Sequence, residues 1–411
     1  MKKYKKLVAA VLAFCSATTI AHAASYQLND YSVTGLGRSY AGLGVVGDDY
    51  SAIAYNPAGM TLKQRSGVQQ VFNMIGVKSE AHELATGEKA TMKFWQPVPA
   101  GFAQYNVNDR FMIGAGIYAP YGLKTKYKAD WFGNESAILS KLDIVDFNVS
   151  AAYKLNDHLS IGASAILRYI YGRMTQKYTV AAPPVPQADI SFNVHGWSQT
   201  GTLGLLYEFT KDTRVGVSYR LRSAQRANGT FKMSHNLIPL ANRSGDVHAN
   251  PDLPETVTFS AYHRIQKFGL SGTARWTHWT SSFPDFSIRS DLIPGGEKKS
   301  YYDYQNTWTL AAGLDYYHDE NWTFRCGVAF DESPTHKPDR RTYRIPDSDR
   351  RWMSVGATYA MENWQFDVAY ALLLAKTSLA TPDATVPGGA PTAKYKDTHS
   401  SILGLQVQYM F

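Results

Sequence analysis

Side chains of opposite character alternate along many short stretches of this 411-residue chain. In the last stretch, Leu403 and Leu405 alternate with Gly404 and Gln406. A period of two places one set of side chains on each face of a β-sheet. Stretches of about ten residues, apolar on one face and polar on the other, are typical of strands that cross a membrane in a β-barrel. A soluble β-sandwich gives a similar alternation, so the pattern alone leaves both folds open.

The connections between these stretches favour the barrel. The pattern predicts about fourteen strands, at 67–79, 91–106, 110–119, 143–154, 158–179, 196–209, 213–233, 254–264, 267–289, 302–317, 321–332, 350–360, 363–378 and 398–411. Short links fall at 107–109, 156–157, 211–212, 265–266, 318–320 and 361–362. Long links fall at 80–90, 120–142, 180–195, 234–253, 290–301, 333–349 and 379–397. Short and long links alternate throughout, as in outer-membrane barrels with tight periplasmic turns and longer external loops, whereas Greek-key connections would not keep this order.

The first 23 residues have the features of a secretory signal peptide. They contain four lysines and no acidic residue, then an apolar stretch at 7–14 and the small-residue site Ala21-His22-Ala23. Removing them lowers the formal charge from +8 to +4, which takes away most of the support for a nucleic-acid partner. Cys326 is then the single remaining cysteine, so no intrachain disulfide can form.

No stretch after residue 23 approaches 18 consecutive apolar residues, which argues against spanning helices. The chain also ends on a strand whose last residue is the aromatic Phe411. Such an ending resembles the signal that outer-membrane proteins present to the barrel assembly machinery, although a chain can also simply stop on a hydrophobic residue. We therefore expect an all-β, transmembrane antiparallel barrel over 67–411 in the outer membrane of a Gram-negative bacterium, in contact with its lipid and lipopolysaccharide.

Residues 24–66 do not alternate like barrel strands. The stretch 35–47 holds five glycines among thirteen residues, and glycine permits tight turns and close approach to a wall. A barrel of this width is not filled by its own side chains alone, so we expect 24–66 to form a plug, or hatch, in the lumen. Residues 42–47 also match the dinucleotide motif G-x-G-x-x-G, but that motif requires a strand before it and a helix after it in a βαβ unit. Neither is apparent here.

Several short motifs occur in a fixed order along the chain. They are 24–30, Gly35-Leu36-Gly37-Arg38, Asp48-Asp49, Asn56-Pro57-Ala58, Tyr121-Gly122-Leu123, Leu253-Pro254-Glu255, 321–325 and Ile345-Pro346-Asp347. These motifs resemble those of the FadL family, outer-membrane transporters of long-chain fatty acids. The resemblance implies a fourteen-stranded barrel plugged by an N-terminal hatch, which agrees with the strand count above.

The resemblance also implies a mechanism of passive uptake. A hydrophobic ligand is caught between external loops, moves to a tighter pocket against the N-terminus, and leaves sideways when the hatch rearranges. By motif, the hatch elements are Asn56, Pro57 and Ala58. The kink that would open the wall lies at Pro120, Tyr121 and Gly122; Pro120 cannot donate to a strand ladder, although the strand could also simply end there.

A fatty-acid head group calls for a cation in the pocket. The candidates are Arg173 and Lys177, with Lys298 and Lys299 behind them, although all four could be surface charges facing lipopolysaccharide. Apolar residues in external loops are candidates for ligand capture or, alternatively, for loop-to-loop packing. They are Trp131, Phe132, Ile138 and Leu139 in one loop, and Leu237, Ile238, Pro239 and Leu240 in another.

Signals for an enzyme are weak, because the chain contains neither G-x-S-x-G nor H-E-x-x-H and no cysteine pair for a metal. We expect no catalytic residue, metal or cofactor, and a monomer. Two other functions stay open. The substrates could be aromatic hydrocarbons, which a branch of the same family imports, or the protein could be a surface or porin-like structural protein.

Overall fold

The structure, a computed structural model, describes residues 26–179, 187–235, 242–282, 285–292, 295–381 and 391–411. The expected signal peptide, residues 1–23, lies outside the described residues. The strands that follow one another around the wall are β1 (Gly67–Glu83), β2 (Lys89–Asn106), β3 (Phe111–Lys126), β4 (Leu139–Lys154), β5 (Leu159–Tyr178), β6 (Ala188–Thr210), β7 (Thr213–Arg220), β10 (Thr256–Ile265), β11 (Phe268–Thr277), β14 (Thr307–Tyr317), β15 (Trp322–Asp331), β16 (Arg350–Met361), β17 (Trp364–Ala375) and β19 (Ala393–Met410).

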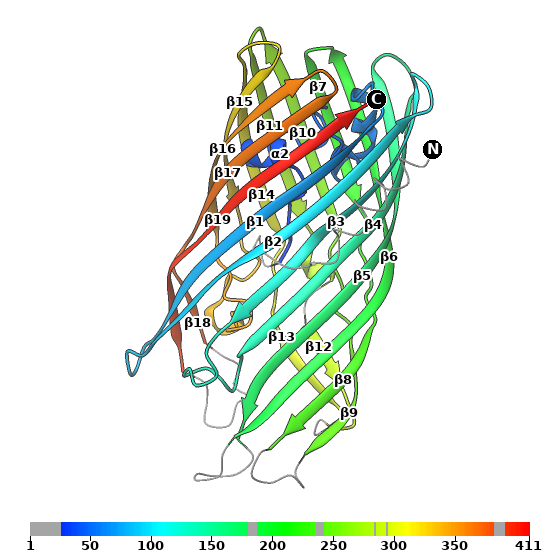
Figure 1. The fold of residues 1–411 in the computed structure, drawn as a ribbon. Coiled ribbons are helices and arrows are strands. Elements are labelled where there is room, and N and C mark those ends of the chain that lie inside the picture. Colours follow the sequence, from blue (N-terminus) through cyan, green and yellow to red (C-terminus); the bar gives the residue numbers. More distant parts are fainter. Residues whose placement is uncertain (1–25, 180–186, 236–241, 283–284, 293–294, 382–390) are drawn as a thin grey trace.

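In the part of the chain that the structure describes, these fourteen strands close into an antiparallel barrel (Figure 1). Each strand pairs with the next, and β19 returns to β1 in a register that starts at Gly67 opposite Met410. This confirms the predicted all-β barrel and its strand number. No described helix has the length and apolar character needed to cross a membrane.

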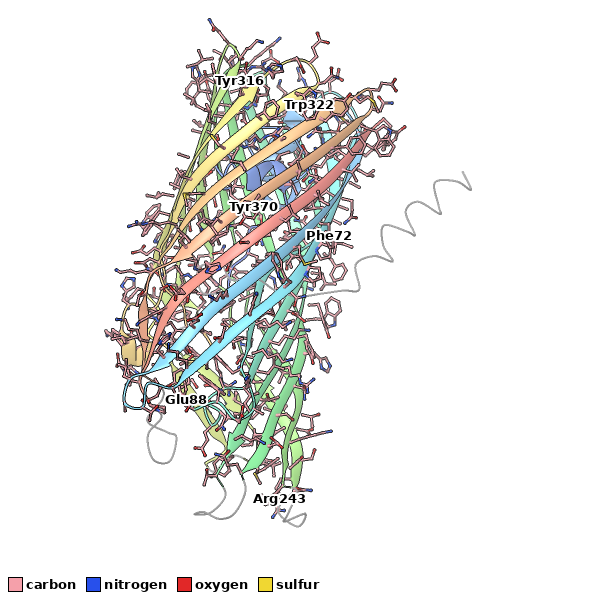
Figure 2. All side chains as sticks on the ribbon, turned by 60° about the vertical axis from the view of Figure 1, so that its left-hand side comes forward. Phe72, Glu88, Arg243, Tyr316, Trp322 and Tyr370 are labelled. Atoms are coloured by element: carbon pink, nitrogen blue, oxygen red, sulfur yellow. The ribbon has the colours of Figure 1, made fainter. Side chains whose placement is uncertain are left out.

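The two faces of the wall differ as the alternation predicts. On β19, Leu403 and Leu405 are 46% and 52% exposed, whereas Gln406 and Gln408, at the alternate positions, are 4% and 0% exposed. Figure 2 shows aromatic side chains such as Trp322 projecting from the outside of the barrel. The apolar set therefore faces outward and the polar set faces the lumen, which is the arrangement of a barrel in lipid.

Two predicted strands are each divided in the structure. The stretch 213–233 separates into β7 and β8 (Ala227–Ser234), and β8 pairs with β6 and β9 (Arg243–Ala249). The stretch 267–289 separates into β11 and β12 (Asp285–Arg289), with the 3-10 helix η4 (Trp279–Ser281) between them. The alternation of apolar and polar residues continues through both breaks, because it indicates which face of the sheet a side chain occupies. It does not indicate which strand lies beside the one that carries it.

Short turns lie at one end of the barrel and long connections at the other. The β8–β9 hairpin and the hairpin of β12 and β13 (Glu297–Tyr301) extend the wall at the long-loop end, which is at the bottom of Figure 1. The short strand β18 (Ser378–Ala380) and the 3-10 helix η5 (Pro338–Arg340) also belong to these connections. The link between β1 and β2 is shorter than predicted and spans only 84–88, because both strands continue into the expected loop.

The N-terminal segment, defined as the described residues 26–66, lies in the lumen (Figure 1). It contains α2 (Val33–Gly37), α3 (Ala52–Tyr55) and the 3-10 helix η2 (Pro57–Leu62). The segment is long enough to cross the lumen, since α2 contacts β15, β16, β17 and β19 on one side while η2 contacts β3 to β6 on the other. The helices are short, so most of their stability comes from packing against the wall.

Candidate functional site

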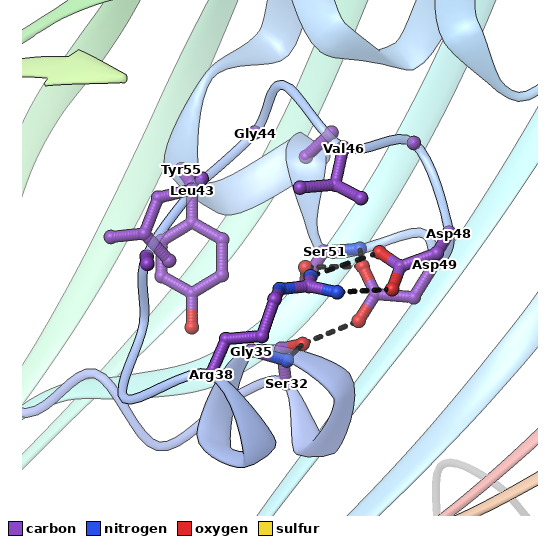
Figure 3. A pocket seen from close by; sticks show the side chains of 14 residues that line it. Ser32, Gly35, Arg38, Leu43, Gly44, Val46, Asp48, Asp49, Ser51 and Tyr55 are labelled. Atoms are coloured by element: carbon purple, nitrogen blue, oxygen red, sulfur yellow. Dashed lines mark hydrogen bonds and ion pairs between the residues drawn. The ribbon is translucent and has the colours of Figure 1, made fainter. Parts of the chain in front are cut away.

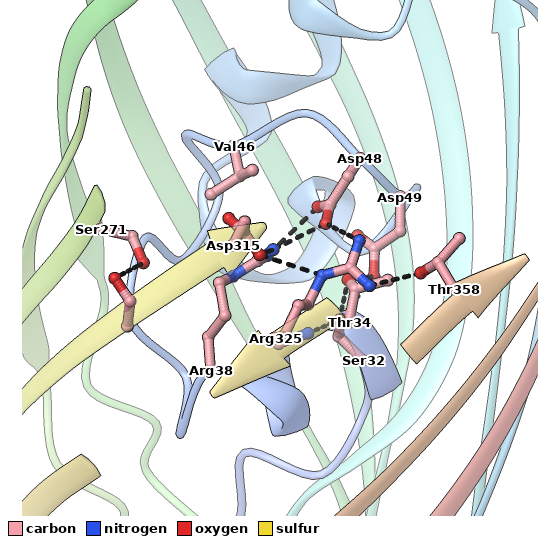
Figure 4. A network of polar contacts seen from close by, with 12 residues as sticks. Ser32, Thr34, Arg38, Val46, Asp48, Asp49, Ser271, Asp315, Arg325 and Thr358 are labelled. Atoms are coloured by element: carbon pink, nitrogen blue, oxygen red, sulfur yellow. Dashed lines mark hydrogen bonds and ion pairs between the residues drawn. The ribbon is translucent and has the colours of Figure 1, made fainter. Parts of the chain in front are cut away.

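Four charged groups join the N-terminal segment to the wall (Figure 4). Arg38 Nη1 lies 2.7 Å from Asp48 Oδ2 and 3.0 Å from Asp315 Oδ1 of β14. Arg325 of β15 is 3.2 Å from the same Asp48 oxygen and 3.1 Å from Asp315 Oδ1. Burial raises the pKa of Asp48, but the two guanidinium groups outweigh it and hold the pKa well below its usual range. The four charges neutralise one another, which allows them to be buried.

The glycine-rich stretch forms a turn beside this network, not a nucleotide site. Gly42, Gly44 and Gly47 all have positive φ angles, between 69° and 78°. The turn and the adjoining helices enclose a small polar cavity, in which Asp49 accepts hydrogen bonds from the side chains of Ser32 and Ser51 (Figure 3). The preceding element is the five-residue helix α2 and no strand, so the βαβ context of the dinucleotide motif is absent from this described stretch.

Asn56 fixes the predicted hatch motif to the opposite wall. Its Oδ1 accepts a hydrogen bond from the Ala58 amide at 3.2 Å, which caps η2, and its Nδ2 donates to the Leu205 carbonyl of β6 at 3.0 Å. The wall carries glycine where this motif docks. A Cβ atom at Gly204 would lie 2.0 Å from Asn56 Oδ1, and one at Gly162 would lie 2.4 Å from the Ala58 nitrogen. Only glycine permits this approach; that the motif opens as a hatch stays a prediction.

The wall is incomplete between β2 and β3. These strands pair only from Gly101 opposite Ile117 to Asn106 opposite Met112, although both strands continue toward the long-loop end. Figure 1 shows them running apart in that direction. On its other side, β3 stays paired with β4, but the register shifts between Tyr118 and Tyr121. We call the unpaired part of this boundary the β2–β3 seam. The predicted kink residues Pro120, Tyr121 and Gly122 lie on it, and a role in lateral exit stays a prediction.

The start of the N-terminal segment takes the place of β2 along the free edge of β3. Leu28 donates its amide hydrogen to the Pro120 carbonyl at 2.8 Å, and Gly122 donates to the Tyr26 carbonyl at 2.7 Å. Tyr26 also packs against Tyr121 and Trp279, with ring centroids 5.9 and 5.3 Å away. Any displacement of residues 26–28 would therefore free the edge of β3 at the seam.

A small cavity, partly open on one side, lies beside this contact. The N-terminal segment, Pro120 and Tyr121 form one side, and β7, β10 and β11 form the other. Two buried arginines line it. Arg220 is 3.3 Å from Asp146, whereas Arg275 donates to two neutral groups, Asn29 Oδ1 and, at 3.3 Å, Thr258 Oγ1. Among the described residues, Arg275 has no carboxylate partner.

An apolar inner surface extends from this cavity toward the long-loop end. It comes from β3 to β6, from the β8–β9 and β12–β13 hairpins, and from the loops after β11 and β15. Its buried members are Tyr26, Tyr121, Leu123, Ile144, Ile170, Ile190, Phe192, Val194, Ala227, Phe231, Val247, Ala249, Leu253, Trp279, Ile288, Tyr302, Tyr304 and Ile345. In the structure these side chains are buried and pack against one another.

The cations predicted to hold a head group do not reach this cavity. Arg173 is exposed, and the alternation along β5 places it with the outward-facing Leu167, not with the buried Arg168. Lys177 lies four residues after Arg173, so it is on the same face of β5, and its Nζ is 2.7 Å from Asp189 Oδ1. Lys299 is an exposed residue of β13, 4.0 Å from Glu297. The period of two places Arg173 and Lys177 on the outward face of β5, away from this cavity, and their role in ligand binding stays a prediction.

The predicted loop residues divide into three groups. Trp131 is buried and stacks on Tyr127 with ring centroids 3.8 Å apart, and Phe132 lies beside it against Tyr343. Both therefore take part in packing between loops. Ile138 and Leu139 are half-buried at the start of β4, away from the apolar inner surface. Leu237, Ile238, Pro239 and Leu240 lie outside the described residues.

Two features of the site were missed from the sequence. Arg275 lies between Ala274 and Trp276 on β11. The alternation indicates that Arg275 points into the lumen only after the two faces of this strand have been assigned to the lumen and the membrane. The seam had a clearer signal in Pro97 and Pro99 of β2. Proline has no N–H to donate, so within a sheet it is confined to free edges, strand starts and bulges.

Residues 14–411 match the family described as "Outer membrane protein transport protein (OMPP1/FadL/TodX)". The chain is 30% identical over 407 residues to a long-chain fatty acid transport protein of Escherichia coli O6:H1, covering 89% of each chain. A crystal structure of a Pseudomonas aeruginosa FadL homologue superposes with a TM-score of 0.84 at 23% identity, covering 94% of this chain and 99% of that one. The Ralstonia pickettii toluene transporter TbuX gives a TM-score of 0.70 at 19% identity, over 93% and 99%.

Proposed function

We propose, because the chain belongs to the OMPP1/FadL/TodX family of outer-membrane transport proteins, that its substrates are long-chain fatty acids. Membership makes it an outer-membrane transporter of hydrophobic compounds and not an enzyme. The observation that carries the finer assignment is the buried guanidinium of Arg275 at the inner end of an apolar surface. A buried cation whose partners are neutral is suited to bind a carboxylate.

The proposed path has three steps. The ligand first enters between the long loops and lies along the apolar inner surface, with its carboxylate toward Arg275. Residues 26–28 and the Asn56-Pro57-Ala58 motif then move together, since both are parts of the N-terminal segment that lines the cavity. The movement frees the edge of β3, and the ligand leaves through the β2–β3 seam into the membrane.

The energetics support a mobile segment. Burying a sixteen-carbon chain gives on the order of 12 kcal/mol at ~0.8 kcal/mol per methylene, and binding costs of several kcal/mol reduce that gain. A closed apolar pocket would therefore hold the ligand tightly. Release requires that the pocket change shape, and such a change needs no energy source when transport follows the ligand's gradient.

Import of aromatic hydrocarbons is the second candidate, since the toluene transporter shares this fold. An aromatic hydrocarbon can make only a cation–π contact with a buried guanidinium, whereas the carboxylate of a fatty acid accepts charge-assisted hydrogen bonds from it. The 30% identity to a long-chain fatty acid transport protein also favours the first candidate.

Binding of hexadecanoate and hexadecanol to the purified protein tests the assignment, because the two ligands share a tail and differ in charge. We expect Arg275→Met to weaken hexadecanoate binding about tenfold or more, as loss of a charge-assisted hydrogen bond predicts, and to leave hexadecanol binding unchanged. Lys78→Met, which removes an outward-facing cation of β1, is the control and should change neither. Equal affinity of Arg275→Met and the unmodified protein for hexadecanoate would reject the role of Arg275. Tighter binding of toluene than of hexadecanoate by the unmodified protein would favour the second candidate.

A further inference from the structure

Lys124 bridges the β2–β3 seam where no backbone ladder does. It lies on β3 beyond the register shift, and its Nζ donates to Gln96 Oε1 of β2 at 3.0 Å. The same ammonium lies 4.9 Å from the centre of the Phe94 ring of β2. Lys124 is three residues beyond Tyr121, which lines the inner cavity, so about 10 Å of strand separates the two positions. A molecule that crossed the seam would pass this ammonium group.

Two further cations continue from Lys124 across β4 and β5, whereas Gln96 and Phe94, which Lys124 contacts, have the parity of the buried residues of β2. Lys141 of β4 lies directly opposite Lys124, and Arg173 of β5 lies directly opposite Lys141. Directly opposed like charges weaken a sheet unless negative groups lie between them. Asp143 supplies a carboxylate 2.9 Å from Lys141. The row nevertheless carries more positive than negative charge, so it favours an anion beside it.

Aromatic side chains lie next to this row on the membrane-facing surface. The Tyr171 ring is 5.6 Å from the Lys141 ammonium. The ring centroid of Trp197 on β6 lies 6.0 Å from that of Phe147 and 4.9 Å from that of Tyr169. Phe147 and Trp197 are 40% and 53% exposed, as expected for residues that contact lipid. The surface beside the seam is thus cationic toward the long loops and apolar toward the middle of the membrane. An amphiphile lying parallel to the strands would have its charged head group at the first part and its tail at the second.

We propose that Lys124 and Lys141 form an exit site for the carboxylate of a long-chain fatty acid, a deepening that rests on the proposed function. The ammonium groups take over the head group as it leaves the inner cavity, while the tail passes through the seam onto the aromatic surface. The head group then never enters the hydrocarbon layer, where a charge is costly. A ligand without a charge would gain nothing from this site.

The test compares uptake of radiolabelled hexadecanoate and hexadecanol by cells that make equal amounts of each variant in the outer membrane. In Lys124→Met/Lys141→Met, we expect hexadecanoate uptake to fall about tenfold, with hexadecanol uptake and the affinity of the purified protein for hexadecanoate unchanged. Lys124→Arg/Lys141→Arg keeps both charges and should restore uptake. Lys78→Met is the matched control, since Lys78 also faces outward beside a carboxylate, 3.0 Å from Glu80, but lies on β1 away from the seam.

Three outcomes would overturn the exit site. Unchanged hexadecanoate uptake in the double methionine variant would show that the head group does not use these lysines. An equal loss of acid and alcohol uptake would show a general effect on the seam. Loss of co-purifying phosphorylated glycolipid, with acid uptake intact, would assign the row to a lipid phosphate instead. If the unmodified protein takes up neither ligand, the proposed function itself fails, so the two failures are distinguishable.

Discussion

At the scale of single residues, buried polar groups decide how the N-terminal segment is held. Asp30 is 1% exposed, and its carboxylate accepts a hydrogen bond from the Tyr40 hydroxyl at 2.7 Å. Burial raises the pKa of Asp30 to about 6, and the hydrogen bond from Tyr40 opposes the rise only in part. This carboxyl group therefore differs from Asp48, whose pKa the neighbouring guanidinium groups lower. The surroundings of Asp30 thus favour its protonated form, whereas those of Asp48 favour its ionised form.

The raised pKa of Asp30 predicts a pH-dependent stability. Its pKa is higher in the folded than in the unfolded protein, so the folded state binds the proton more tightly and loses stability as the pH rises from about 4 to about 6. The shift corresponds to about 3 kcal/mol at ~1.4 kcal/mol per pKa unit. We expect Asp30→Asn to be more stable than the unmodified protein by up to that amount above pH 6, and equally stable near pH 4.

Urea unfolding in detergent between pH 4 and pH 8 measures this difference. Asp157→Asn, a substitution in an exposed turn, is the control and should follow the unmodified protein at every pH. A constant gap between Asp30→Asn and the unmodified protein across the whole pH range would contradict the assignment to the Asp30 carboxyl group.

At the scale of elements, β3 is the strand whose local irregularity has the largest consequence. Three residue steps separate Tyr118 from Tyr121, while the partner strand advances only two steps, from Asp146 to Ile144. The extra residue is a β-bulge, which bends a strand and increases its twist. Beyond the bulge, β3 leaves β2 and pairs with the N-terminal segment. The N-terminal segment pairs with β3 only around Tyr121, and beyond that point the edge of β3 toward β2 has no strand partner in the described residues.

Removing the extra residue should close the seam. Deletion of Pro120 leaves two steps between the tyrosines, which restores a regular register with β4 and favours pairing with β2. We expect hexadecanoate uptake to fall about tenfold or more, and to fall by more than the affinity of the purified protein, although Pro120 also lines the cavity. Deletion of Ala85, in the loop between β1 and β2, shortens the chain equally and should affect neither. Comparable losses of uptake and affinity would argue against lateral exit.

At the scale of the whole molecule, the wall and the N-terminal segment are shaped for one another. Inward-facing glycines on β5 and β6 receive Asn56-Pro57-Ala58, and Gly327 of β15 receives the backbone of Arg38, since a Cβ there would lie 2.2 Å from the Arg38 carbonyl carbon. A fourteen-stranded barrel is wider than the eight-stranded kind that side chains can fill. The segment therefore fills part of the interior, and the proposed function requires that the same segment move.

Deletion of Asn56-Pro57-Ala58 should separate assembly from transport. The barrel strands do not depend on this motif for their pairing, so we expect normal insertion into the outer membrane together with loss of hexadecanoate uptake. In planar bilayers the unmodified protein should pass little steady ion current, because its lumen is filled, and the deletion variant should pass more. Normal uptake by a correctly inserted deletion variant would reject the hatch role. A large constant current through the unmodified protein would instead support a porin-like function.

The sequence by itself determined the wall. Alternation along stretches such as 398–411 is a local property, because side-chain direction follows from the period of a strand, and it established the strand number, the faces and the alternation of short and long links. The short motifs and their order were also readable from the sequence, and they led to the family. The same alternation also indicates that Arg173 points outward. Its position near the end of the strand, considered alone, suggests a place in the pocket.

The tertiary structure decided where the interior groups meet. Arg275 and Asn29 are 246 residues apart in the chain, yet they are in hydrogen-bond contact. Which strand loses its partner at Pro120, and which residue replaces that partner, depends on how the N-terminal segment packs against a closed wall. Period and composition report the direction of each side chain, but contacts between distant segments arise only when the barrel closes and its lumen is filled.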